Sequence, residues 1–461
     1  MSDPIDIIDV CLGLNTAVDP AEMGKHDLAY AVNAVITEGK RIARADGYGL
    51  VRALTDGHSI FRDDGICLVA QGTSLHQVAP DNTLSGIRSG MTGDRICYQQ
   101  YGNETYYVNG ADKGIVRDAL SYVWNVGTYN GPTTTRFFEP TIPNFEKIAI
   151  HAGRMFGAIG NSLFESELGD FGLWDCSKAF SLAGRIIMVL SVDGGLFVSD
   201  EKTTWFLAGS CLDDMAPKQV ANYPAIEWGV ATEKVEALEI GLSSPGLCSL
   251  WLSREGIGLG APGGIFINIT KDRVAYPSSG SRGAALLRGY DLIATLDDSF
   301  CTQTALTVGE LRGKATTNRS HFPFNSFCRR GDEFLACSDS GIYLLGGDDY
   351  NGVDIDMDIE TLTTDFGYKG VKSMRRFYLG TNSQGSFAVT PYADDVAGMQ
   401  IFTENSKTGR QTIRKSFASR LSSGAKHDGR YWKFKIQNVD GADCTINQFS
   451  VLPINQALGR G

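Results

Sequence analysis

A short motif that recurs along this chain limits the fold more than any other feature of the sequence. Residues 70–75 (AQGTSL) and 158–163 (AIGNSL) share the pattern A-x-G-x-S-L, and apolar residues precede the motif in both cases. The central glycine permits the tight turn of a β-hairpin. The sequence therefore predicts the same strand–turn–strand unit at two separate places.

Looser copies of this unit follow at residues 105–110, 189–199, 250–257 and 334–344, and the copy at 189–199 contains the hairpin signal Asp193-Gly194. The distance between copies is comparable to the ~40–50 residues of a four-stranded propeller blade. One hairpin cannot bury its apolar face alone, whereas a closed ring of sheets can, and closure also removes exposed sheet edges. We expect a β-propeller of five to seven blades over residues 51–350. A β-sandwich built from similar hairpins is the alternative.

Composition supports an all-β chain. Glycine accounts for 54 of the 461 residues without a G-x-y period, which excludes collagen and indicates many tight turns between short strands. Helical periodicity is weak and limited to one segment, Ala21 to Val32. The sequence therefore predicts a single short helix at most.

The two ends of the chain differ from the middle in their residue pattern. We expect residues 1–50 to form an N-terminal arm with an entry hairpin, and residues 351–461 to form a β-sandwich with strands near 375–379, 386–391, 409–417, 431–437 and 442–452. Acidic and apolar residues alternate strictly over 354–360, which predicts a strand with one solvated acidic face. Calcium binding is a weaker alternative, because a flat strand spreads the carboxylates apart.

Charge is distributed unevenly. The chain has 42 Lys and Arg against 53 Asp and Glu, for a net charge of −11, which does not favour nucleic acid or anionic lipid as a partner. Residues 400–435 reverse this balance, with nine basic residues against two acidic ones. Such a split favours docking between unlike surfaces; a solvated basic face and contact with nucleic acid are the alternatives.

Motifs that carry chemistry are missing from the sequence. The ten cysteines are dispersed without C-x-x-C spacing, so we expect reduced structural thiols and no disulfide framework. The six histidines form no zinc-ligand pattern, and neither a hydrolase elbow nor a phosphate-binding loop is present. The start of the chain lacks the basic and apolar regions of a signal peptide. We therefore predict no cofactor, no metal and no enzymatic activity.

Several motifs resemble those of tailed-bacteriophage virion proteins. Residues 14–20 (LNTAVDP), 28–39 (LAYAVNAVITEG) and 41–48 (RIARADGY) are similar to the opening of such proteins, in which a short arm leads into a hairpin. Residues 153–174, 195–209, 251–270 and 430–443 also resemble them. The resemblance implies a β-propeller tail protein of the hub or nozzle type, repeated as a ring beneath the portal and adaptor. Known nozzle proteins are usually longer, so a minor tail protein and a tail-tip or capsid-attached component stay open.

The expected function is thus structural: a virion tail component, made in the bacterial cytoplasm, that forms a homo-oligomeric ring around the DNA-exit channel. Its partners would be the portal, the adaptor and a tail fibre or tail tip, with transient passage of genomic DNA and no membrane contact. A net negative chain suits a lumen that repels phosphate. The predicted assembly residues are Leu14, Asn15, Asp19, Pro20, Arg410, Arg414, Arg420 and Arg430.

Two other functions remain open at this point. A propeller module that binds a host-surface receptor or glycan would be favoured by exposed aromatic residues at loop tips, such as Tyr101, Tyr106, Trp124 and Tyr129. A polysaccharide-degrading tail enzyme would need paired carboxylates at a central cleft.

Overall fold

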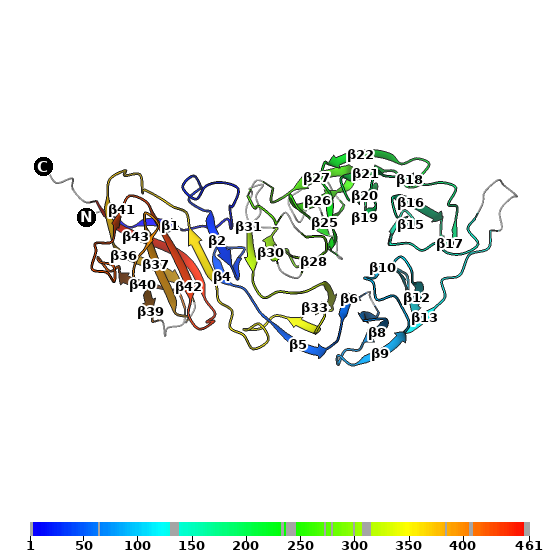
Figure 1. Ribbon diagram of the computed structural model, residues 1–461, viewed down its shortest axis with the longest axis horizontal. Coiled ribbons are helices and arrows are strands. Elements are labelled where there is room, and N and C mark those ends of the chain that lie inside the picture. Colours follow the sequence, from blue (N-terminus) through cyan, green and yellow to red (C-terminus); the bar gives the residue numbers. More distant parts are fainter. Residues whose placement is uncertain are drawn as a thin grey trace.

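The computed structural model describes residues 3–62, 65–129, 138–231, 235–236, 246–271, 273–277, 280–297, 300–306, 315–382, 385–404 and 409–455. These residues form two all-β units, a β-propeller and a β-sandwich, which lie side by side (Figure 1). Among them the only helical element is a 3₁₀ turn, η1 (Pro262–Gly264). No helix of the described residues has the length and apolarity needed to cross a membrane.

Seven sheets of the described chain form the propeller, and each contains a path of four antiparallel strands. In chain order the sheets are β6 (Gly57–Arg62), β7 (Cys67–Gln71), β8 (Ser74–Val78) and β9 (Leu84–Arg88); β10 (Cys97–Tyr101), β11 (Glu104–Val108), β12 (Lys113–Arg117) and β13 (Leu120–Tyr122); β14 (Lys147–His151), β15 (Arg154–Ile159), β16 (Ser162–Glu167) and β17 (Asp170–Trp174); β19 (Ile186–Val192), β20 (Gly195–Asp200), β21 (Thr204–Ala208) and β22 (Ala216–Ala221); β23 (Ala225–Val230), β25 (Leu247–Ser253), β26 (Gly256–Ala261) and β27 (Ile265–Asn268); β28 (Gly283–Arg288), β29 (Asp291–Leu296), β30 (Phe300–Ala305) and β31 (Ala315–Arg319); and β32 (Ser326–Arg330), β33 (Glu333–Ser338), β34 (Gly341–Leu345) and β5 (Tyr48–Ala53). Short strands β18 (Phe180–Ser181) and β24 (Val235–Glu236) pair with β16 and β25.

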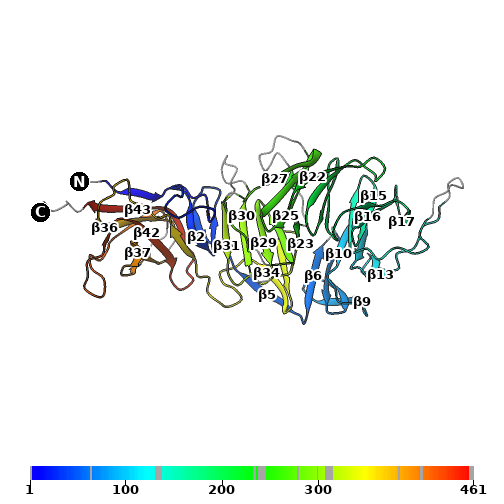
Figure 2. The same ribbon diagram turned by 45° about the horizontal axis from the view of Figure 1, so that its top comes forward.

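The ring closes by sharing strands between its two ends. The last sheet takes three strands from residues 326–345, and its outermost strand is β5, whose Ala53 pairs with Gly341 and whose Tyr48 pairs with Leu345. Figure 2 shows β5 leaving the sandwich and running beside β34. The predicted β-propeller of five to seven blades is therefore confirmed, and the sandwich alternative for residues 51–350 is not what forms.

The A-x-G-x-S-L motif corresponds to one position in the blade. Residues 70–75 connect β7 to β8 and residues 158–163 connect β15 to β16, which are the second and third strands of their sheets. Gly72 and Gly160 adopt φ values of +51° and +56°, where glycine is favoured. Leu75 and Leu163 are fully buried. The repeat therefore marks the central hairpin of a blade.

The second unit is a β-sandwich whose two sheets enclose an aromatic core. One sheet contains β1 (Ile5–Ile8), β3 (Ala34–Ile36), β4 (Ile42–Arg44), β36 (Lys372–Thr381), β40 (Gln411–Ser416), β41 (Asp428–Gly429) and β43 (Thr445–Asn455). The other contains β2 (Leu28–Val32), β35 (Asp358–Thr361), β37 (Phe387–Ala393), β38 (Val396–Ala397), β39 (Ile401–Thr403) and β42 (Trp432–Asn438). Phe377, Phe387, Phe434 and Phe449 are fully buried between them.

The N-terminal segment does not behave as a separate arm. β1 and β4 both pair with β43, and β2 pairs with β35, so residues predicted as an arm are built into the sandwich. The predicted helix from Ala21 to Val32 is wrong: turns occupy its first part, and its end is strand β2, because Leu28 and Ala31 are buried in the sandwich core. The five strand regions expected after residue 351 each overlap an observed strand.

The alternating segment 354–360 is a strand only from Asp358, where β35 begins, but its acidic and apolar residues lie on opposite faces as predicted. Ile355, Met357 and Ile359 are fully buried. On the other face, Asp358 forms an ion pair with Lys435 at 2.6 Å and Glu360 lies 3.9 Å from Lys433. The acidic face is thus partly neutralised by basic residues of the neighbouring strand β42 as well as by solvent.

The two units are joined by a continuous sheet and by an ion pair between the buried Arg319 and the half-buried Asp46. Val32 of β2 pairs in parallel with Asn318 of β31, so the sheet of one blade continues into the sandwich. Between β4 and β5, Asp46 accepts a hydrogen bond from Arg319 at 2.7 Å and also contacts Arg288. Burial alone would raise the pKa of Asp46, but the two guanidinium groups outweigh it and hold that pKa below its ordinary value.

Candidate functional site

The axis of the propeller is a cavity of about 260 Å³, lined by residues of all seven innermost strands. Most of the lining is apolar and includes Ile148, Ile150, Met188, Val230 and Phe327. Each sheet has four antiparallel strands, an even number, so the chain leaves every sheet in the same direction relative to the axis. Every innermost strand therefore starts at the same mouth of the channel. Residues at the beginning of these strands are therefore brought together, although they are far apart in the sequence.

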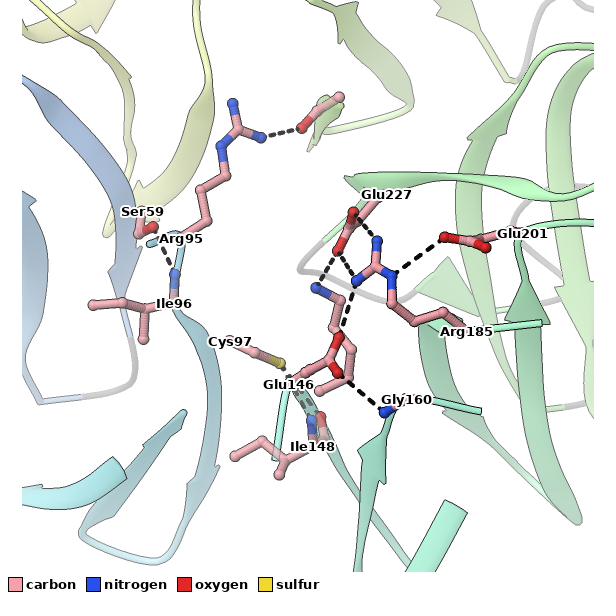
Figure 3. Close-up of polar contacts among 12 residues, drawn as sticks. Ser59, Arg95, Ile96, Cys97, Glu146, Ile148, Gly160, Arg185, Glu201 and Glu227 are labelled. Carbon is pink, nitrogen blue, oxygen red and sulfur yellow. Dashed lines mark hydrogen bonds and ion pairs between the residues drawn. The ribbon is translucent and has the colours of Figure 1, made fainter. Parts of the chain in front are cut away.

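A network of five charged residues occupies this mouth (Figure 3). Lys147 at the start of β14 lies 2.9 Å from Glu227 of β23, and Arg185 just before β19 lies 2.9 Å from the same carboxylate. Arg185 also contacts Glu146 at 2.9 Å and Glu201 at 3.3 Å. Three successive blades are thereby linked by ion pairs.

The two cations around Glu227 determine its charge state. Burial alone would raise the pKa of Glu227, but Lys147 and Arg185 outweigh this effect and hold it below its ordinary value. Burial lowers the pKa of Lys147, and Glu227 opposes that shift. The Lys147 ammonium also lies 3.1 Å from the centre of the Trp228 ring, a cation–π contact. The network fixes side chains within the wall of the channel.

Arg95 closes the channel further. It precedes β10 and donates a hydrogen bond to the carbonyl oxygen of Gly283 at 2.9 Å, the first residue of β28. These two strands belong to sheets that are not neighbours in the ring, so the side chain spans the mouth (Figure 3). Nearby, the Ser59 hydroxyl accepts a hydrogen bond from the Ile96 amide at 2.9 Å, which joins the first two blades.

The axial cavity of a single propeller is separate from the lumen that a ring of copies would enclose, so the acidic lumen expected from net charge stays a prediction. The charged residues that line the axial cavity are Arg95 and Lys147, and none of the described residues that line it is acidic. Glu146, Glu201 and Glu227 stand at the mouth, and each is paired with a cation. The axis of a single propeller is therefore a mostly apolar cavity whose mouth is crossed by ion pairs and by the Arg95 hydrogen bond.

The predicted N-terminal assembly residues have different surroundings. Leu14 is a core residue, 1% exposed, so its side chain offers nothing to a partner. Asn15 is half-buried and donates a hydrogen bond to Asp27 at 2.7 Å. Asp19 and Pro20 are exposed, and the Asp19 carboxylate accepts a hydrogen bond from the Ala21 amide at 2.8 Å. Only the last two lie on the surface.

The predicted C-terminal assembly residues are all exposed and all belong to the sandwich: Arg410, Arg414, Arg420 and Arg430. Arg414 extends from β40 over the ring of Tyr378 in the adjacent strand, 5.7 Å from its centre. Arg420 donates a hydrogen bond to the carbonyl oxygen of Gly424 at 2.7 Å. We refer to these four arginines as the basic edge.

The thiols and the candidate metal ligands are arranged as follows. All ten cysteines are free, and burial raises the pKa of Cys301 to about 12. The sulfur atoms of Cys67 and Cys328 lie 3.9 Å apart, between the first and last blades. Within the described ranges, no group of three or more His, Cys, Asp or Glu residues could hold a metal ion.

The loop-tip aromatic residues divide into two classes. Tyr101 and Tyr129 are exposed, whereas Tyr106 and Trp124 are buried. Tyr122, which is not among the loop-tip residues predicted from the sequence, is also exposed. The segments 101–106 (YGNETY) and 122–129 (YVWNVGTY) have no regular alternation that would reveal which ring faces solvent.

Comparisons with known proteins give similarities to solved structures and no family. No protein-family model and no curated protein matches this chain. Among solved structures, the WD40 β-propeller domain of Doa1 is similar at 13% identity and a TM-score of 0.43, covering 65% of this chain and 97% of that one. Streptogramin B lyase is similar at 8% identity and a TM-score of 0.41, covering 63% and 93%. The extracellular domain of the putative one-component system BT4673 from B. thetaiotaomicron is similar at 14% identity and a TM-score of 0.43, covering 83% and 49%.

Proposed function

We propose that this protein is a structural component of a bacteriophage virion, a tail hub or nozzle protein. In this proposal it assembles into a homo-oligomeric ring around the DNA-exit channel and docks on portal, adaptor, tail fibre or tail-tip proteins. The sequence motifs that resemble tailed-phage virion proteins suggest the particle, and the proposed role is architectural, without turnover.

The observation that carries the proposal is the basic edge of the sandwich. β40 ends the strand order of its sheet in the described chain, and Arg414 projects from it into solvent. An edge strand presents unpaired backbone groups to a neighbouring chain, and a basic edge on an otherwise acidic chain favours an acidic neighbour. A second copy of the same acidic chain meets this requirement.

A propeller axis that is closed by polar contacts at its mouth is compatible with a ring of several copies. A cavity of about 260 Å³ crossed by Arg95 cannot admit a nucleic acid duplex. In the proposed assembly, DNA passes through the space that the copies surround, and each propeller acts as a rigid wall element.

The test is incorporation into virus particles. Arg414→Glu combined with Arg420→Glu should leave the protein folded, because both side chains are exposed, and should abolish its incorporation into particles purified from infected cells. Arg52→Glu is the matched control: Arg52 is an exposed arginine of β5, on the propeller. Immunoblotting of purified particles measures the effect. Normal incorporation of the double variant would refute the docking role of the basic edge.

A further inference from the structure

A second concave site lies on the rim of the propeller, between its second and third sheets. We call it the aromatic groove. It has a volume of about 450 Å³, within the roughly 300–1,000 Å³ of small-ligand sites. It is lined by Tyr101, Glu104, Tyr106, Ile115, Arg117, Tyr122, Val123, Trp124, Asn125, Gly169, Asp170, Phe171 and Gly172.

The floor of the aromatic groove is rigid. Tyr106 packs edge-on against Trp124 and Phe171, with ring centres 5.1 Å and 5.5 Å apart. The Trp124 indole donates a hydrogen bond to the carbonyl oxygen of Phe171 at 3.1 Å. These contacts hold residues of two blades together, so the hollow exists before any ligand arrives.

Two aromatic rings stand at the open side of the groove. Tyr101 is 50% exposed and Tyr122 is 39% exposed. Tyr101 packs edge-on against Phe171 at 4.9 Å, and the Arg117 guanidinium lies over the Tyr122 ring at 4.8 Å. Both rings are therefore positioned by neighbours while they keep contact with solvent.

Hydrogen-bonding groups accompany these rings. Glu104 forms an ion pair with Arg117 at 3.1 Å and accepts a hydrogen bond from the Tyr106 hydroxyl at 2.7 Å. Asp170 accepts a hydrogen bond from the Gly172 amide at 2.8 Å. Burial raises the pKa of Tyr106, and the hydrogen bond to Glu104 adds to the effect, so this hydroxyl stays protonated. The groove thus combines aromatic surface with fixed donors and acceptors.

We propose that the aromatic groove binds an oligosaccharide made of neutral or amino sugars. The C–H face of a pyranose ring packs on an aromatic ring, while its hydroxyl groups need both donors and acceptors around their edge. Two carboxylates, Glu104 and Asp170, against one guanidinium, Arg117, give the lining a negative balance that disfavours uronic and sialic acids. A concave site of this size suits a short saccharide better than a protein surface, which needs about 800 Å² on each partner.

This inference does not depend on the proposed function, because the groove lies on the propeller and the basic edge lies on the sandwich. A virion protein with this groove would contact a glycan of its host. A protein with the groove and without the virion role would still bind the sugar.

The test uses the full chain and a panel of defined oligosaccharides: N-acetylglucosamine oligomers and neutral hexose oligomers, with sialylated and uronic acid oligomers as comparators. Isothermal titration calorimetry measures binding. Tyr122→Ala should weaken binding of the preferred neutral or amino sugar at least tenfold, because it removes an exposed ring, and Glu104→Gln should also weaken it while preserving side-chain shape. Tyr290→Ala is the matched control, since Tyr290 is also 39% exposed but belongs to the turn between β28 and β29.

The outcomes separate clearly. Binding that Tyr122→Ala and Glu104→Gln weaken and that Tyr290→Ala leaves unchanged supports the proposal. Binding to no member of the panel would overturn it and leave the groove to a protein partner. Preference for the acidic oligomers, or equal effects of Tyr122→Ala and Tyr290→Ala, would overturn it as well. Loss of virion incorporation in the basic-edge variant has no bearing on these results.

Discussion

The channel mouth and the aromatic groove are built from the same kinds of residue, yet the structure uses them differently. At the mouth, the charged groups bond to one another, and the side chains of Lys147 and Glu227 are only 7% and 15% exposed. In the groove, the ion pair of Glu104 and Arg117 lies beside aromatic rings that face solvent. Residue type therefore does not show which of the two clusters stays open to solvent, whereas the exposed fractions of the side chains do.

The largest expected effect concerns the channel mouth. Glu227→Ala removes the carboxylate shared by Lys147 and Arg185 and leaves a buried ammonium without its counter-charge. Breaking one side of a buried ion pair costs about 3–5 kcal/mol. Equilibrium unfolding in urea should show a loss of that order. The control is Glu201→Ala, which removes an exposed member of the same network and should cost at most ~1 kcal/mol. Equal losses of unfolding free energy for Glu227→Ala and Glu201→Ala would show that the ion pairs at the mouth gain nothing from burial, which would remove the contrast with the groove.

A smaller effect is expected from pH. The pKa of Glu227 in the folded protein lies below the ordinary value of 4.5, so the unfolded chain binds the proton more readily. The stabilisation from this group is present above pH 4.5 and is lost as pH falls through the lower, folded-state pKa. Between pH 7 and acidic pH, the wild type should therefore lose more unfolding free energy than Glu227→Gln, whose side chain at this position cannot be protonated in this range. Parallel pH profiles for the two proteins would contradict this assignment.

The smallest effect on stability is expected in the groove. Tyr122→Ala removes a ring that is 39% exposed at the end of a three-residue strand, and exposed substitutions usually change stability by less than about 0.5 kcal/mol. Thermal unfolding of this variant should therefore match that of Tyr290→Ala. A loss of 2 kcal/mol or more would show that the Tyr122 ring supports the fold, as the residues at the channel mouth do.

The propeller was predictable because its signal is local and repeated. Each copy of the hairpin motif carries its own turn glycine and buried apolar residues, as at Gly72 with Leu75, so the pattern survives in a single sequence. The sandwich was only half predictable. The strands after residue 351 could be located, but the pairing of β1 with β43 joins Ile5 to Val451, and no local pattern records such a partner.

The candidate sites were the least predictable part. Lys147, Arg185 and Glu227 are separated by about 40 residues each, and they meet only because successive innermost strands start at the same mouth. Among the aromatic residues of the groove, Tyr101 and Tyr106 are two residues of one hairpin, yet one is exposed and the other is buried. Their different exposure depends on the neighbouring blade.

The pairing of the first strands with the last has a consequence for synthesis. β1, β2 and β4 leave the ribosome before their partners β35 and β43 exist, whereas the propeller can close as soon as β34 reaches β5. The propeller can thus fold while the sandwich is still incomplete, since domains generally fold as units during translation. A nascent chain halted before residue 358 would carry a complete propeller beside N-terminal strands that lack β35 and β43, so apolar residues such as Ile7 and Leu28 would be without the part of the core that those strands supply.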